Sequence, residues 1–287
     1  MTNQNSDRIF DLSATAPEAI VSQSEVTWWR RLYELEWCRR LLVLVALAVL
    51  WEAYARWLDN SLLFPSFSET VAALVNGLKT GVLVDRILTS LGVLIFGYAV
   101  GLGIAVALAM VAMSSKLGRD LQTTLTAMFN PLPAIALLPV AMLWFGLGTG
   151  SLVFVLAHSV IWSFSLSIIS GFDGVSPTLR MVGRNYGLRG VSYIWKILIP
   201  AAFPSLLTGL RLGWAFAWRT LIAAELVFGV SAGSGGLGWF IYENKNQLEI
   251  ASVFAGLSSV IVIGLVVEYL VFRLVEAKTV RRWGVSV

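Results

Sequence analysis

The chain of 287 residues contains one cysteine and one histidine, and this scarcity argues against several classes of protein at the outset. Cys38 alone cannot build a disulfide framework or a cysteine metal cluster. His158 lies inside an apolar run, where packing within a helix is a commoner role than binding a ligand. The sequence therefore predicts neither a disulfide-stabilised secreted domain nor a metal centre.

Charge is also scarce. Charged residues make up 13% of the chain and hydrophobic residues 57%, whereas an ordinary soluble domain has about 25% charged residues. So little charge cannot cover the surface of a water-soluble protein of this length. The composition indicates a chain that spends most of its surface in lipid.

Apolar segments recur along the chain, at about residues 41–58, 87–113, 125–147, 152–169, 202–227 and 251–274. Each is close to or longer than the roughly 20 residues that a helix needs to cross a bilayer. The third contains Pro131, Pro133 and Pro139, which favour either an ordinary kink or an irregular helix that lines a pathway. We predict an all-α membrane protein with six transmembrane helices over residues 39–275.

The distribution of lysine and arginine predicts the orientation in the membrane. With the N-terminus in the cytoplasm, these residues concentrate in the cytoplasmic connections, and those on the outside are few: Arg56, Lys79, Arg86 and Lys245. We therefore expect both termini in the cytoplasm. The formal net charge of +4 then reflects orientation and gives no reason to expect nucleic acid as a partner.

The ends of the chain are predicted to be cytoplasmic tails. The first 27 residues are mostly polar and lack a basic start followed by an apolar run, so we expect no signal peptide there. Residues 1–38 are interpreted as a partly disordered tail, and residues 276–287 as a short C-terminal one.

One cytoplasmic connection, residues 172–200, has an unusual pattern for a loop. Ser176 followed by Pro177 is a typical helix start, since a hydroxyl caps free N–H groups and proline needs no N–H partner. Leu179, Val182 and Tyr186 follow at helical spacing and form an apolar stripe. A short amphipathic helix is predicted from Pro177 to Tyr186.

This helix should end at Gly187, because glycine adopts the left-handed conformation at little cost. A second amphipathic stretch, VSYIWKILI, leads to Pro200 at the start of the fifth segment. The apolar stripe needs a surface to cover it. That surface is either the chain's own bundle with the lipid headgroups or a groove on a partner protein.

The loop resembles that of bacterial ABC importer permeases, in which a Glu-Ala-Ala triplet is followed by three residues, glycine, nine residues and Ile-x-Leu-Pro. Met181, Val182 and Gly183 occupy the triplet positions here, and Met181 replaces the acidic residue. The resemblance implies a docking site for an ATPase, made of Leu179, Met181, Val182, Gly183, Tyr186, Gly187, Leu188 and Pro200.

Other stretches resemble the nitrate/sulfonate/taurine branch of these permeases, in the same order along the chain. They are VLWEAYARWLDNSLLFPSFSETVAALV, NPLPAIALLPVAMLWFGLGTGS, PSLLTGLRLGWAFAWRTLIAAEL and GSGGLGWFI. The resemblance implies a type I importer permease in a bacterial inner membrane, paired with a second permease copy, most simply an identical one. It also implies separate ATPase subunits and an external solute-binding protein.

No G-x-x-x-x-G-K-[ST] phosphate-binding loop occurs in the sequence. We therefore expect no enzyme activity and no cofactor in this chain, with ATP and Mg²⁺ bound by the partner ATPase. Membrane lipid is the remaining expected partner.

The polar residues within the apolar segments are the candidates for a translocation pathway: Arg219, Arg211, Glu225, Asn130 and Pro133. A charge near the bilayer centre costs about 2.5–3.5 kcal/mol, so it should face protein or water. Arg219 and Glu225 lie about 120° apart around one helix, so they do not pair along one face. Arg219 either pairs with another helix or lines the pathway for an anion. Arg211 is expected nearer the cytoplasm, at an inner vestibule or lipid headgroups.

The sequence thus predicts the permease subunit of an ATP-driven importer for a small anion such as nitrate, taurine or another sulfonate. A stand-alone secondary transporter is the alternative. The sequence has no evident internal repeat and no buried acidic cluster for proton coupling, so neither feature supports that alternative.

Overall fold

In the computed structural model, residues 35–228 and 235–280 are described, and every regular element among them is helical. The chain divides into two compact units, residues 1–51 and 52–287. Helix α2 (Glu36–Leu58) begins in the first unit and ends in the second. Most of the predicted tails, residues 1–34 and 281–287, lie outside the described residues.

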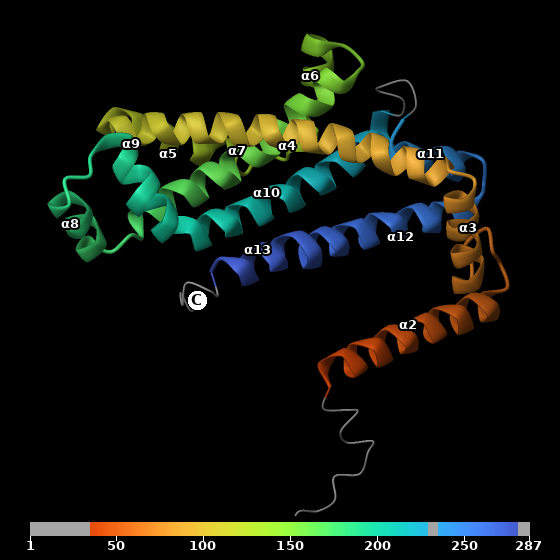
Figure 1. The fold of residues 1–287 in the computed structure, drawn as a ribbon. Helices are drawn as coiled ribbons and strands as arrows, with labels where there is room; N and C mark the ends of the chain where they lie inside the picture. The colour runs from red at the N-terminus through yellow and green to blue at the C-terminus, as the bar shows by residue number, and fades with distance from the viewer. Residues whose placement is uncertain (1–34, 229–234, 281–287) are drawn as a thin grey trace, which may run out of the picture. The chain divides into compact units, whose positions relative to one another are not determined.

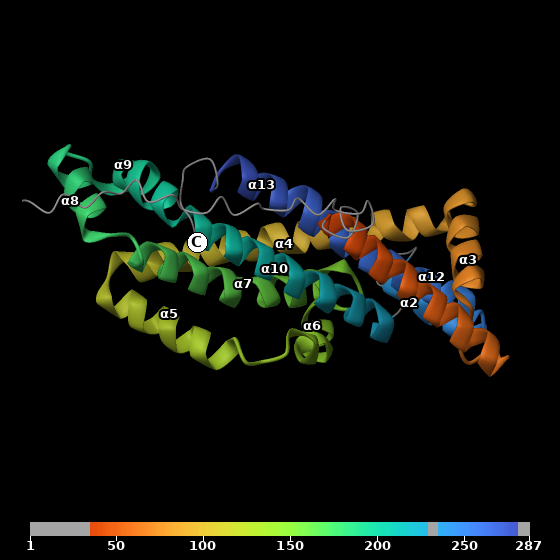
Figure 2. The same cartoon turned by 90° about the horizontal axis from the view of Figure 1, so that it is seen from below.

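Three long helices form the core of the second unit: α4 (Val82–Ser114), α7 (Thr149–Asp173) and α10 (Ile199–Phe228). Helix α7 packs against both α4 and α10 and is the most deeply buried of the apolar helices. Helix α12 (Ile250–Val266) continues through a π-helical turn, η3 (Val267–Phe272), into α13 (Arg273–Lys278), and this run lies along α10 (Figures 1 and 2).

Close packing of α4 on α7 depends on glycine. A methyl group at Gly97 would lie 2.8 Å from the Leu156 side chain, and one at Gly101 would lie 2.8 Å from Val160. Small residues let helix backbones approach closely in lipid, where the packing of side chains replaces the hydrophobic effect as the main attraction between helices.

Among the described residues, five helices are long and apolar enough to cross a membrane, and a sixth span is completed if a bent pair counts as one. The pair is α5 (Lys116–Phe129) with the helical stretch Ala134–Phe145, and its members meet at 90°. That stretch is a 3₁₀ turn, η1 (Ala134–Leu137), followed by α6 (Leu138–Phe145). The predicted all-α membrane fold is confirmed.

The structure corrects the third predicted segment, which is not one continuous helix. The chain breaks between Phe129 and Ala134, where Pro131 and Pro133 cannot donate backbone hydrogen bonds. Pro139 lies in the first turn of α6, where a missing N–H costs nothing.

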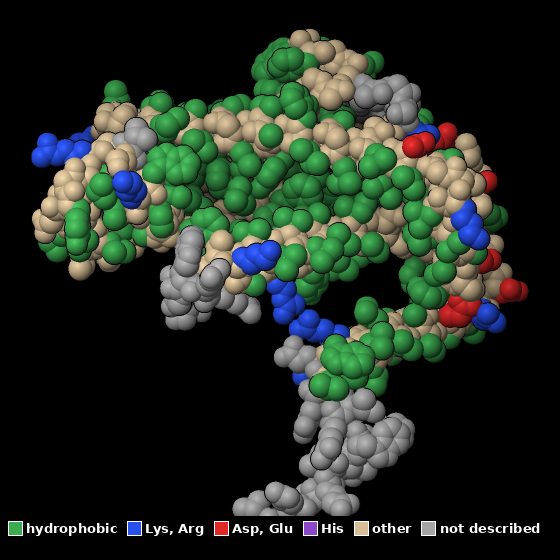
Figure 3. All heavy atoms as spheres, in the orientation of Figure 1, with side chains coloured by type: hydrophobic (Ala, Val, Ile, Leu, Met, Phe, Trp, Pro, Cys, Tyr) green, Lys and Arg blue, Asp and Glu red, His purple; other side chains and the backbone are tan. Residues whose placement is uncertain are grey.

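Short helices lie at the two ends of the second unit (Figure 1). At one end are α8 (Pro177–Asn185) and α9 (Gly190–Tyr193), which continues through the π-helical turn η2 (Ile194–Leu198) into α10. At the other end are α3 (Phe67–Lys79) and α11 (Leu237–Asn246), which the sequence analysis missed because neither is long enough to span. On the face seen in Figure 3, hydrophobic side chains are gathered along the long helices between these ends.

Candidate coupling surface and solute cleft

Helix α8 begins and ends as the sequence predicts. The Ser176 hydroxyl accepts a hydrogen bond from the Leu179 N–H at 3.3 Å, and Pro177 is the first helical residue. At the other end Gly187 has φ +72°, the left-handed conformation. The Leu188 N–H then donates to the Gly183 carbonyl at 3.0 Å, which closes the helix.

Helix α8 carries exposed apolar side chains. The exposed fraction is 44% for Leu179, 57% for Met181, 40% for Val182 and 82% for Tyr186. These side chains lie at the end of the unit, beyond the long apolar helices (Figure 1). The chain's own bundle therefore does not cover the stripe.

Part of α8 rests on η2 and the helix before it. Gly183 is buried there, and a methyl group in its place would lie 2.9 Å from the Tyr193 ring and 3.0 Å from the Ile197 side chain. The glycine thus allows α8 to lie directly against the run that leads into α10.

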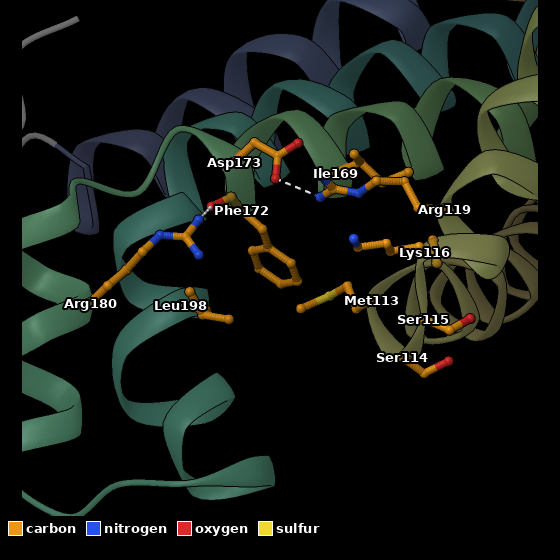
Figure 4. A pocket seen from close by; sticks show the side chains of 11 residues that line it. Met113, Ser114, Ser115, Lys116, Arg119, Ile169, Phe172, Asp173, Arg180 and Leu198 are labelled. Atoms are coloured by element: carbon orange, nitrogen blue, oxygen red, sulfur yellow. Dashed lines mark hydrogen bonds and ion pairs between the residues drawn. The ribbon is translucent and has the colours of Figure 1, made fainter.

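Arg180 fastens α8 to the end of α7 (Figure 4). Its guanidinium group donates to the backbone carbonyls of Phe172 and, at 3.1 Å, Val175. Carbonyls at the end of a helix lack helical partners and carry partial negative charge, so a cation stabilises them. Beside this contact Arg119 of α5 pairs with Asp173 at 2.7 Å. Together they surround a cavity of about 380 Å³ at this end of the unit.

Pro200, the last residue of the predicted docking loop, lies in the first turn of α10, directly after the π-helical turn. Proline has no N–H, and its ring clashes with the carbonyl four residues earlier. The wider turn accommodates this, since the Ile199 N–H bonds to the Ile194 carbonyl five residues before it. Leu188, which follows Gly187 in the same loop, is half-buried.

A second cavity, of about 360 Å³, brings together three of the residues predicted to line a pathway: Arg219, Asn130 and Pro133. We call it the Arg219 cleft. Its walls are the broken stretch after α5, the middle of α7 and the later part of α10, and they also include Phe129, His158, Ser159, Trp162, Phe216 and Thr220. Irregular backbone is tolerated at membrane depth where it lines such a cavity.

Arg219 is exposed in this cleft. Its Nε donates to the Ala215 carbonyl at 3.1 Å, and its guanidinium group lies 5.1 Å from the centre of the Phe216 ring. No ion pair joins it to a carboxylate in the part of the chain that the structure describes. Its positive charge is therefore available to an anion in the cleft.

Arg211 does not line the cleft. Its guanidinium group forms ion pairs with Glu268 and Glu276, both at 3.1 Å, and lies 5.8 Å from the centre of the Phe272 ring. These contacts connect α10 with η3 and α13. The structure places Arg211 in a neutralised interhelical contact.

Glu225 is buried away from the cleft, and it caps a helix. The Ser90 hydroxyl lies 2.8 and 2.9 Å from its two carboxylate oxygens, and the Gly238 N–H donates to it at 2.8 Å. The Leu237 N–H in turn donates to the Ser90 hydroxyl at 2.7 Å. Glu225 and Ser90 thus satisfy the first free N–H groups of α11.

The sequence analysis missed the aromatic wall of the cleft. His158 and Trp162 are one helical turn apart on α7, so their spacing alone places them on one face. What the spacing could not show is that the break after Phe129 brings that ring to the same face, stacked on Trp162 at 5.1 Å.

Long apolar helices around a cleft that contains Arg219, with an attached helix exposed at one end, fit a membrane transport subunit. The chain belongs to the family described as binding-protein-dependent transport system inner membrane component, whose model matches residues 99–280.

Curated relatives agree with this family. The chain is 30% identical over 228 residues to a putative ABC transporter permease protein of Methanocaldococcus jannaschii, with 78% of this chain and 83% of the relative covered. It is 29% identical to the taurine transport system permease protein of Escherichia coli (59% and 60% covered). It is also 29% identical to the nitrate import permease protein of a Synechocystis strain (64% and 65% covered).

The fold recurs in a solved structure, described as the crystal structure of an amino acid ABC transporter with histidines. The TM-score is 0.54 at 17% sequence identity, and the match covers 73% of this chain and 98% of that one. The predicted membership among ABC importer permeases of the nitrate/sulfonate/taurine branch is confirmed. This chain is a multi-pass transport subunit, which leaves the alternative of a stand-alone secondary transporter without support.

Proposed function

We propose that this chain forms the alternating-access pathway of an ATP-driven importer for a small anionic solute, in the class of nitrate, taurine and other sulfonates. A solute-binding protein delivers the solute from outside, and a separate ATPase with bound ATP and Mg²⁺ docks on α8. Two copies of the chain assemble in a bacterial inner membrane. The chain itself binds no cofactor.

The observation that carries this proposal is the exposed apolar face of α8, made of Leu179, Val182 and Tyr186, with Met181 exposed beside it. A groove on a partner protein can cover such an apolar helix face. Because Arg180 ties α8 to the end of α7, and α7 also forms a wall of the Arg219 cleft, movement of α8 would reach the cleft.

An anion is the solute class that fits the cleft. Arg219 is its cationic side chain, and the structure describes no acidic residue in its lining. The printed names of the Escherichia coli and Synechocystis relatives, taurine and nitrate permeases, agree with an anionic group on the solute.

Site-directed crosslinking tests the docking surface. Because Cys38 is the single cysteine, Cys38→Ser gives a cysteine-free background for Met181→Cys. A benzophenone attached at position 181 should crosslink in native membranes to one protein of ATPase size, which mass spectrometry identifies by its phosphate-binding loop.

The matched control is Leu62→Cys, an equally exposed position (61% against 57% for Met181) near α3, at the other end of the unit. It should give no ATPase product. Crosslinking to an ATPase from position 62 and not from position 181 would contradict the proposed docking surface.

A further inference from the structure

The wall of the Arg219 cleft contributed by α5 and α7 is an aromatic cluster. Phe129 and Trp162 stack with their ring centres 5.1 Å apart and 15° between their planes. His158 meets both edge-on, 6.1 Å from Phe129 and 5.9 Å from Trp162. Phe216, on which Arg219 lies, adds a further ring to the lining.

Within this cluster two side chains have polar atoms without partners. His158 is only 9% exposed, and neither of its ring nitrogens has a hydrogen-bond partner among the described residues. The same holds for Nε1 of Trp162. Buried polar atoms in native proteins are nearly always paired. These nitrogens are closed to solvent here, so a molecule in the cleft reaches them where the His158 or Trp162 ring turns toward it.

The volume of the cleft limits which solutes can fill it. A volume of about 360 Å³ falls in the range of roughly 300–1,000 Å³ typical of sites for organic molecules. A nitrate ion would occupy a small part of it and would leave the aromatic wall without contact. A short aliphatic anion would contact that wall but could not stack on it.

We propose that the solute taken by the Arg219 cleft is an aromatic carboxylate or sulfonate. Its anionic group pairs with Arg219, and its ring packs among Phe129, Trp162 and Phe216. A turn of the Trp162 or His158 ring toward the cleft then lets its N–H donate a hydrogen bond to an oxygen of the solute. This inference rests on the proposed function, because it assigns the substrate class of the same pathway.

Binding to the full-length chain in lipid nanodiscs tests the assignment without the binding protein, whose own selectivity would mask that of the cleft. Saturation-transfer NMR titrations would use benzenesulfonate and taurine as probes. Benzenesulfonate should bind about ten-fold more tightly than taurine, because only it can stack on aromatic rings.

Substitutions that keep a ring but remove the nitrogens identify the contacts. Trp162→Phe and His158→Phe retain the aromatic cluster, and at least one should weaken benzenesulfonate binding about five-fold through loss of a hydrogen bond. The matched control is Trp195→Phe, at an exposed tryptophan in η2 outside the cleft, which should leave binding unchanged. Melting curves of all three variants would confirm that they fold.

Equal binding of benzenesulfonate and taurine would overturn the aromatic assignment, as would unchanged binding in both cleft variants. In either case, if Arg219→Gln loses binding of both benzenesulfonate and taurine, the proposed anion pathway is still supported. Binding of benzylamine as tight as that of benzenesulfonate would contradict the proposed anion pathway itself.

Discussion

At the scale of single residues, Glu225 shows how a buried charge can serve the fold. Its carboxylate meets Ser90 and the start of α11, and Gly236 and Gly238 make room for it. A methyl group at Gly236 would lie 2.1 Å from the Glu225 carboxylate, and one at Gly238 would lie 2.6 Å from its Cβ. Glycine is therefore required at these two positions, because the backbone there approaches the carboxylate closely.

Replacing this carboxylate should destabilise the protein. Glu225→Ala leaves the Ser90 hydroxyl and the Gly238 N–H without their acceptor, at a cost of about 1–3 kcal/mol each. We expect a lower melting temperature of the full-length chain in detergent. Asp120→Ala, at an exposed acid of α5 with no contact in the described structure, is the control. Equal melting temperatures for the two variants would be incompatible with the capping role.

Arg219 should affect transport more than assembly. Arg219→Gln removes the positive charge from the cleft, and we expect the KM for uptake of the anion to rise about ten-fold or more, since hydrogen bonds to charged groups are the stronger ones. The measurement is initial uptake by cells that contain the whole importer. Arg273→Gln on α13 is the charge-matched control, and parallel changes in both variants would rule out a specific role for Arg219.

The residues of the cleft could be predicted in part from the sequence. Arg219, Asn130 and Pro133 stand out as polar or helix-breaking residues in apolar segments, and the structure brings these three together. The contacts of Glu225 with Ser90 and of Arg211 with Glu276 could not be predicted, because these partners lie 135 and 65 residues away along the chain. Only the packing of α4, η3 and α13 against α10 brings them close.

At the scale of elements, α8 is held by a glycine contact and by a side chain. Gly183 permits the close contact with Tyr193 and Ile197. Arg180 reaches the Phe172 carbonyl in the last turn of α7 and the Val175 carbonyl just beyond it. A helix that is attached to the bundle and also exposes a docking surface can pass a movement of its partner on to the bundle.

Changing the end of α8 should uncouple ATP hydrolysis from uptake. At Gly187→Val a β-branched residue would have to adopt φ +72°, which costs about 1–2 kcal/mol or forces the turn to open. ATP hydrolysed per solute imported should increase while the chain stays in the membrane. Gly103→Val, on α4 with open space around it, is the control. Normal coupling at Gly187→Val would remove this account of the loop.

Arg180→Ala tests the attachment of α8 to α7. Loss of the two carbonyl contacts should leave the ATPase bound through the apolar face, yet lower uptake several-fold, because α8 would move without α7. The measurement is uptake relative to the amount of co-purified ATPase. Unchanged uptake would show that Arg180 transmits no motion.

Long apolar helices were the elements that the sequence predicted best, since about 20 residues of low polarity leave few alternatives. The break between α5 and α6 was missed because three prolines in an apolar run fit a kink as well as a 90° turn. Helices α3 and α11 were missed because their length and mixed composition resemble a loop.

At the scale of the whole molecule, the described parts of the second unit arrange the proposed steps from one end to the other. The exposed face of α8 lies at one end, α3 and α11 lie at the other, and α7 connects α8 to the Arg219 cleft (Figure 1). The central claim is that the apolar face of α8 receives a partner ATPase.

The most direct test is co-purification of the tagged full-length chain from its own membranes in mild detergent. The wild type is compared with Leu179→Ala/Val182→Ala/Tyr186→Ala, and with Leu62→Ala/Leu63→Ala/Leu248→Ala as an equally exposed control. We predict that wild type and control retain an ATPase and that the α8 variant loses at least nine-tenths of it, about 1.4 kcal/mol of binding free energy or more. Equal retention by all three chains, or no ATPase with wild type in several mild detergents, would contradict the account.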